Sequence, residues 1–181
     1  PTSGLYFFDG KNMLDYSAEE LARLRNKKMG FVFQAFNLLP RTSVLENVKL
    51  PLAYSEVRQS EWEALAESAV EKVGLKHRIY HQPSQLSGGE KQRVAIARAL
   101  VLNPLVIFAD EPTGNLDSKS GGQVMEAIEA LHESGHTIIL ITHETYTAAF
   151  AQRIIELKDG LIEKDRISSE RHRSRDHEFV K

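Results

Sequence analysis

Two continuously apolar runs restrict the fold more than any other feature of this sequence. Leu105 to Ala109 and Thr137 to Thr142 lack the alternation of a half-exposed strand. They are typical of central parallel strands that are covered on both faces. Shorter runs of strand length, Leu5 to Phe8 and Met29 to Phe33, precede them. Segments with helical periodicity separate the runs, and this alternation predicts an α/β fold with a mainly parallel sheet.

Start signals mark the predicted helices. The pattern Ser-x-x-Glu, which satisfies free amides at a helix start, begins at Ser17, Ser43, Ser60 and Ser87. Residues from about 45 to 84 hold helices and no good strand, so we expect them to form a helical subdomain with the helix after Ser87. Near the C-terminus, Lys158-Asp159-Gly160 lies between two short apolar segments and predicts the turn of a hairpin.

The composition excludes several classes of function. The 181 residues are 41% hydrophobic and 27% charged, which is typical of a globular protein with a real core. The chain has no cysteine, so disulfides, thiolate metal sites and cysteine nucleophiles are excluded. A net charge of −2 gives no attraction to nucleic acid. Apolar runs are too short to cross a bilayer and no secretory signal is visible, so we expect a cytoplasmic protein or a piece of one.

Two carboxylates follow one of the apolar strands. Asp110 and Glu111 come directly after Leu105 to Ala109, and ligands of open α/β sheets bind off the carboxyl ends of the strands. One carboxylate there can hold Mg²⁺, and its neighbour can orient an attacking water for phosphoryl transfer. The alternative is an exposed turn that is acidic without any function.

A glycine pair opens the helix after Ser87. Gly88 and Gly89 allow a backbone to approach a phosphate closely, and the helix start presents free amides. The alternative is an ordinary capping box in which Glu90 reaches back to Ser87. Both can hold at once, but glycine in a first turn destabilises a helix and therefore requires a reason.

Five segments follow one another along the chain: Gln34 after a strand, Leu86 to Arg93, Asp110-Glu111, Asn115 to Asp117, and His143 at a strand end. Together and in this order, they resemble the motifs of ABC-type ATPases. The amino-acid sequence around these motifs resembles that of the lipoprotein-release and macrolide-export branch of the family. The segments that carry this finer resemblance are Phe31 to Pro40, Glu46 to Val48, and Asp110 to Asp117.

The resemblance implies a role for each residue. Asp110 and Gln34 would hold Mg²⁺, Glu111 would be the catalytic carboxylate, and His143 and Gln34 would complete the surroundings of the γ-phosphate. The ATP-binding residues contributed across a head-to-tail homodimer would be Ser87, Gly88, Gly89 and Asp117. The implied partner is a transmembrane permease and not a nucleic acid, and the implied location is the cytoplasmic face of the cell membrane. The remaining histidines have no role in the resemblance; we expect surface positions and no metal cluster for His77, His81, His132 and His136.

One motif of the family is absent from these residues. No Gly-x-x-x-x-Gly-Lys-Ser/Thr phosphate loop is present, and Gly4 to Asn12 has the wrong spacing and bulky aromatic residues. The resemblance therefore implies a P-loop NTPase-like fold without its N-terminal strands and phosphate loop, truncated before residue 1. We expect the neighbouring strands to expose unpaired edges and apolar faces. The expected division is a partial ATPase domain over 1–164 and a charged tail over 165–181.

Two other classes of function remain as alternatives. A DNA-repair ATPase with a long coiled coil carries the same signature, but only 52 residues separate Gln34 from Ser87, which leaves no room for its heptads. The second alternative is a non-catalytic interaction module that derives from an ABC ATPase. The missing phosphate loop keeps this second alternative open.

Overall fold

The computed structural model describes residues 3–168 and 171–173. The strands are β1 (Phe7–Phe8), β2 (Lys11–Asn12), β3 (Met29–Val32), β4 (Val106–Asp110), β5 (Thr137–Ile141), β6 (Arg153–Lys158) and β7 (Leu161–Ile167). The α-helices are α1 (Ala18–Lys28), α2 (Val44–Lys49), α3 (Trp62–Lys72), α4 (Gly88–Leu100), α5 (Ser118–Glu133) and α6 (Thr145–Ala148). Short 3₁₀ turns are Met13–Asp15, Leu50–Tyr54, Gln59–Glu61, Lys76–Arg78 and Pro83–Gln85.

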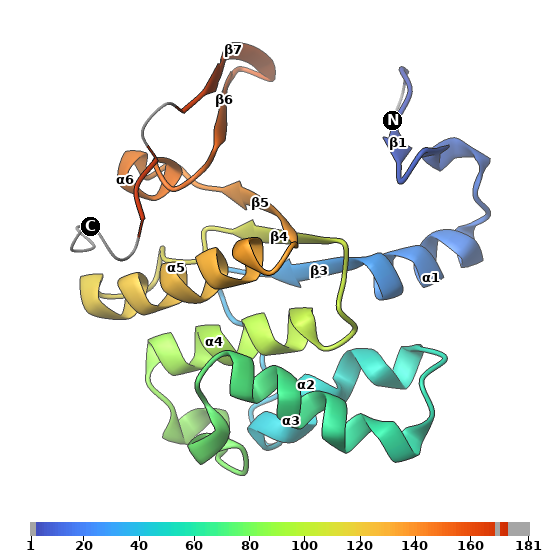
Figure 1. Cartoon of the computed structure of the whole chain (residues 1–181), viewed down its shortest axis with the longest axis vertical. Coiled ribbons are helices and arrows are strands. Elements are labelled where there is room, and N and C mark those ends of the chain that lie inside the picture. Colours follow the sequence, from blue (N-terminus) through green and yellow to red (C-terminus); the bar gives the residue numbers. More distant parts are fainter. Residues whose placement is uncertain (1–2, 169–170, 174–181) are drawn as a thin grey trace.

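A three-stranded parallel sheet forms the centre of the fold, as the sequence predicts. Its strand order is β3-β4-β5, and both pairings are parallel. Helices α4 and α5 lie on one face of this sheet, and α2 and α3 lie beyond α4 (Figure 1). Val32, Ile107 and Ala109 turn towards these helices and are buried in the main core.

The opposite face of the sheet is partly open. Phe31, Phe108 and Ile139 stand in one row of the sheet register. The N-terminal segment packs near Phe108, but Phe31 is 40% and Ile139 is 42% exposed. The prediction that the strands are covered on both faces is therefore wrong for β5, whose residues alternate between exposed and half-buried. One face of β5 is exposed because α4 and α5 both pack on the other side of the sheet (Figure 1).

The predicted helix starts are correct where a side chain caps the helix. Ser17 and Ser87 form complete capping boxes, and Ser43 accepts from the amide of Glu46. The prediction for Ser60 is wrong. A 3₁₀ turn leads into α3, and the amides of Glu61 and Trp62 donate to backbone carbonyls, so these amides need no side-chain cap.

The C-terminal part holds the predicted hairpin. Strands β6 and β7 pair antiparallel, and Asp159 and Gly160 take left-handed conformations at its tip. Strand β7 runs to Ile167, three residues past the expected end of the domain. Arg171, in the expected charged tail, is only 17% exposed and lies 3.9 Å from Glu129 of α5.

None of the helices within the described residues is long and apolar enough to cross a membrane.

Gly30 is required by the contact between β3 and α4. A Cβ atom at Gly30 would lie 2.7 Å from the carbonyl oxygen of Ala99, and a backbone atom cannot move aside as a flexible side chain can. We expect Gly30→Ala to lower the free energy of unfolding by about 1–3 kcal/mol, as overpacked cores do. Urea unfolding measures this change, with the exposed Lys27→Ala as the control. A variant as stable as the wild type would contradict the tight packing of β3 on α4.

Glu90 makes the stability of the α4 start dependent on pH. The backbone amide of Ser87 lowers the pKa of Glu90 below its ordinary 4.5, Arg78 adds to this effect, and burial opposes it. Because the folded pKa is depressed, the stabilisation is complete above the unfolded pKa and is lost as the pH falls through the folded pKa. We expect Glu90→Gln to destabilise the protein by about 0.5–1 kcal/mol at pH 7.

The difference between Glu90→Gln and the wild type should shrink towards zero when urea unfolding is repeated at pH 3. The exposed Glu56→Gln should match the wild type at both pH values. A difference that is the same at pH 7 and pH 3 would rule out the charge of Glu90 as its cause.

Candidate functional site

Glu111 sits at the carboxyl end of β4 in a tightly fixed turn. Asp110 is the last residue of β4, and Glu111 follows with a left-handed φ of 45°. The amide of Glu111 donates to the carbonyl of Ile141 on β5 at 2.9 Å, and the amide of Gly114 donates to the carbonyl of Glu111 at 3.1 Å. A non-glycine residue with positive φ is uncommon; here the backbone bond to β5 holds it.

His143 lies directly against the Glu111 carboxylate. Its Nδ1 is 2.5 Å from Oε1 of Glu111, and its backbone amide donates to the same oxygen at 3.1 Å. The hydroxyl of Thr142 donates to the other oxygen at 3.3 Å. The Glu111 side chain is 18% exposed, whereas that of His143 is 80% exposed. The ring can therefore turn away, while the carboxylate stays at the end of the sheet.

Gln34 follows β3 and meets the turn that begins at Glu111. The backbone carbonyl oxygen of Gln34 accepts a hydrogen bond from Nδ2 of Asn115 at 3.1 Å. The structure thus brings together the three predicted catalytic residues, Gln34, Glu111 and His143, at the carboxyl ends of neighbouring strands. Asp110 is exposed at the same edge.

The residues at this edge fit a magnesium ion. Asp110 offers an exposed carboxylate and Gln34 an amide oxygen, and Mg²⁺ prefers such oxygen ligands and keeps several waters. Among the described residues there is no cluster of three or more His, Cys, Asp or Glu that could hold a metal. A magnesium site here would therefore depend on water and on a phosphate for its other ligands.

Ser87, Gly88, Gly89 and Asp117 form a second group. Ser87 caps α4, and Asp117 caps α5 by accepting from the amide of Ser120 at 2.9 Å. The hydrogen bond from this amide is the main reason why the pKa of Asp117 is lowered. The residues from Gly114 to Asp117 connect this second group to the group of Gln34, Glu111 and His143.

The glycines of this group have packing partners in the same chain. A Cβ at Gly88 would lie 3.1 Å from Cδ2 of Leu116, and one at Gly89 would lie 2.9 Å from Cβ of Ser120. The close approach of the α4 start to the α5 start is thus a structural reason for both glycines. Their presence is not by itself a sign of phosphate binding.

A buried polar connection behind the site is not evident from the sequence. The hydroxyls of Thr113 and Thr147, both fully buried, donate to Oε2 of Glu144 at 2.9 and 2.7 Å. These contacts tie the turn after Glu111 to helix α6, which follows His143. The position of Glu144 beside His143 is the one sequence signal that could have indicated it.

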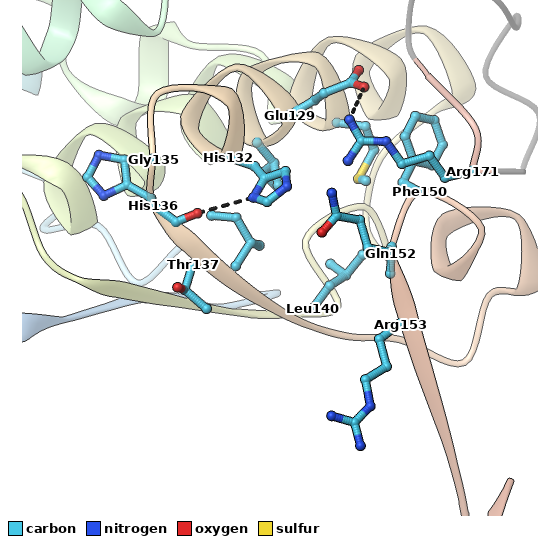
Figure 2. Close-up of a pocket in the computed structure, with 14 residues that line it drawn as sticks. Glu129, His132, Gly135, His136, Thr137, Leu140, Phe150, Gln152, Arg153 and Arg171 are labelled. Atoms are coloured by element: carbon cyan, nitrogen blue, oxygen red, sulfur yellow. Dashed lines mark hydrogen bonds and ion pairs between the residues drawn. The ribbon is translucent and has the colours of Figure 1, made fainter. Parts of the chain in front are cut away.

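A cavity of about 440 Å³ lies between α5, β5 and the segment that leads to β6 (Figure 2). His132, His136, Glu129 and Arg171 line it, and none of the predicted site residues does. The prediction that His136 lies on the surface is wrong: it is 9% exposed, and its Nδ1 lies 2.8 Å from the carbonyl of Pro104. His77 is exposed, as predicted. The cavity is therefore separate from the candidate site.

Comparisons with known proteins agree with the geometry. The profile of the ABC transporter family matches residues 1–114. The chain is 51% identical over 162 residues to the uncharacterized ABC transporter ATP-binding protein YknY of Bacillus subtilis, covering 90% of this chain and 70% of that protein. It is 51% identical over 175 residues to the macrolide export ATP-binding/permease protein MacB of Chlorobium phaeobacteroides, covering 97% of this chain. It spans about a quarter of that relative's length, 26%.

Solved structures give the same result. The ATP-binding cassette MJ0796, in a dimeric post-hydrolysis state bound to ADP and Pi, aligns with a TM-score of 0.79 at 42% identity, over 92% of this chain and 74% of that chain. The protein cbiO1 of Clostridium perfringens, part of an ABC transporter complex, aligns with a TM-score of 0.81 at 31% identity, over 91% and 66%. The parallel sheet is thus that of the P-loop NTPase fold of these cassettes. This chain belongs to the ABC transporter family, as part of an ATP-binding cassette.

Proposed function

We propose that this chain is the ATP-binding and hydrolysing subunit, or part of it, of an ABC transporter that works with a transmembrane permease. The observation that carries the proposal is the Glu111 carboxylate, held at the end of β4 within reach of His143 and beside the loop of Gln34. A carboxylate in this place can orient a water for attack on a phosphate, which is the positioning work that phosphoryl transfer requires. The macrolide-export relatives support an export role for the whole protein.

Each residue of the edge has a defined task in this proposal. Asp110 and Gln34 would hold Mg²⁺, which neutralises phosphate charge when bound. Glu111 orients the water, and His143 contacts the γ-phosphate. In the structure, His143 and Thr142 occupy both oxygens of Glu111. The exposed His143 ring can turn away from Oε1 of Glu111, and this oxygen then has room to accept from a water.

The proposed subunit works as a head-to-tail homodimer. Ser87, Gly88 and Gly89 of one subunit would contact the ATP held by the other, and Asp117 would lie at the contact between the two. The dimeric form of the cassette MJ0796, to which this chain is 42% identical, supports this arrangement. The dimer would sit at the cytoplasmic face of the membrane against the permease and would not bind nucleic acid.

A phosphate loop would come from a segment before residue 1. The exposed Phe31, Ile139 and Ile141 form an apolar face, and β5 is an end strand of the described sheet. This agrees with the expectation that strands next to a missing segment expose unpaired edges and apolar faces, which favour association. We propose that a segment with Gly-x-x-x-x-Gly-Lys-Ser/Thr covers this face and pairs with the free strand edge.

The requirement for this segment can be measured directly. We expect isothermal titration of residues 1–181 with Mg-ATP to show no micromolar binding. A form extended at its N-terminus by a phosphate-loop segment should bind, and the same form with the loop lysine changed to alanine should not. Micromolar binding and turnover by residues 1–181 alone would overturn the idea that the segment is needed.

The role of Glu111 is tested in the extended form. Glu111→Gln keeps the shape of the side chain but removes the charge that orients the water, so we expect hydrolysis to fall by roughly 10²-fold or more. ATP should then accumulate in a dimer, which light scattering detects in the presence of Mg-ATP. The exposed Glu133→Gln at the end of α5 is the matched control. Hydrolysis by Glu111→Gln at the wild-type rate would rule out the proposed role.

A further inference from the structure

Gly114 has a fixed position relative to Glu111. The two residues are the first and last of one tight turn, closed by the amide of Gly114 donating to the carbonyl of Glu111 at 3.1 Å. Pro112 and Thr113 between them are buried. A second turn follows at once, because the amide of Leu116 donates to the carbonyl of Thr113 at 3.0 Å. Any group that packs against Gly114 is therefore placed relative to the Glu111 carboxylate.

The group that packs there is the side-chain amide of Gln34. A Cβ atom at Gly114 would lie 2.6 Å from Nε2 and 3.3 Å from Cδ of Gln34. The next atom, the carbonyl oxygen of Glu111, would be 3.4 Å away, which is an ordinary contact. Gly114 is not among the residues with positive φ, so its backbone conformation is open to any residue. The absence of a side chain at 114 thus leaves the space that the Gln34 amide occupies.

The backbone around Gln34 is held from two sides. Asn115 donates to the carbonyl of Gln34 itself at 3.1 Å. Helix α4 holds the flanking residues: the buried Gln92 donates to the carbonyl of Phe33 at 3.3 Å, and Arg98 donates to the carbonyl of Phe36 at 2.9 Å. Because these contacts fix the loop backbone, an obstacle at position 114 would displace the Gln34 side chain and not the loop.

We propose that Gly114 is a positioning residue that sets where the Gln34 amide stands relative to Glu111. It takes no part in binding or chemistry itself; it acts through Gln34. Its effect on the reaction rests on the proposed function, in which Gln34 helps to hold Mg²⁺. Its effect on the position of Gln34 does not depend on that function.

The position of Gln34 is tested first, in the chain of residues 1–181. The side-chain amide signals of Gln34 in a ¹⁵N–¹H spectrum are identified by their loss in Gln34→Ala. We expect Gly114→Ala to shift these signals while the unfolding midpoint stays close to that of the wild type, because the end of a flexible side chain yields. The exposed Ser118→Ala, four residues further along, should leave the signals in place. Unshifted Gln34 signals, or a large loss of stability in Gly114→Ala, would overturn the proposal.

The effect on the reaction is tested by a double-mutant cycle in the form extended with a phosphate loop. We expect Gly114→Ala to lower kcat about tenfold, since small misplacements of a positioned group have effects of this size or larger. It should also raise the Mg²⁺ concentration needed for half-maximal rate. In the Gln34→Ala background, Gly114→Ala should have no further effect.

The outcomes separate this inference from the proposed function. If Gln34→Ala slows the reaction and Gly114→Ala does not, or if the two effects multiply, the positioning role of Gly114 is wrong. If Gln34→Ala leaves the rate and the Mg²⁺ dependence unchanged, the role of Gln34 in the proposed function is wrong. In that case the amide signals still decide whether Gly114 sets the position of Gln34.

Discussion

The parallel pairing of β4 with β3 and β5 is the constraint on which the rest of this structure depends. Ala109 stands in register with Val32 on one side and with Leu140 on the other. The three strands therefore end together, and the residues that follow them meet at one edge of the sheet. Burial of Ile107 and Ala109 under α4 and α5 holds this register, because a shift by one residue would turn these side chains out of the core.

Local rules were enough to predict the features that local contacts create. The hairpin turn at Asp159-Gly160 and the capping boxes at Ser17 and Ser87 are made by residues within a few positions of one another. The meeting of Asp110-Glu111 with other strand ends follows from the rule that ligands bind at the carboxyl edge of a parallel sheet. The prediction for Ser60 failed because the 3₁₀ turn before α3 had already used nearby amides, which the sequence pattern does not reveal.

Features that depend on distant packing could not be predicted in this way. No pattern in the sequence indicates that His136 is buried against Pro104. The continuously apolar run Thr137 to Thr142, taken alone, indicates a strand that is covered on both faces, whereas one face of β5 is exposed. The glycines after Ser87 are the most instructive case. Their packing on Leu116 and Ser120 and the proposed contact with a phosphate both require the same absence of side chains, so the pattern alone could not separate the two reasons.

The segment from Glu111 to Asp117 connects all parts of the candidate site. It begins at the carboxylate that His143 contacts, touches Gln34 through Gly114 and Asn115, and reaches Gly88 through Leu116. This short segment is stiff because two consecutive turns in it are each closed by a backbone hydrogen bond and because Thr113 is buried. The Gln34 loop and the first turn of α4 therefore cannot shift independently of Glu111, because each would have to break its contact with the same seven residues.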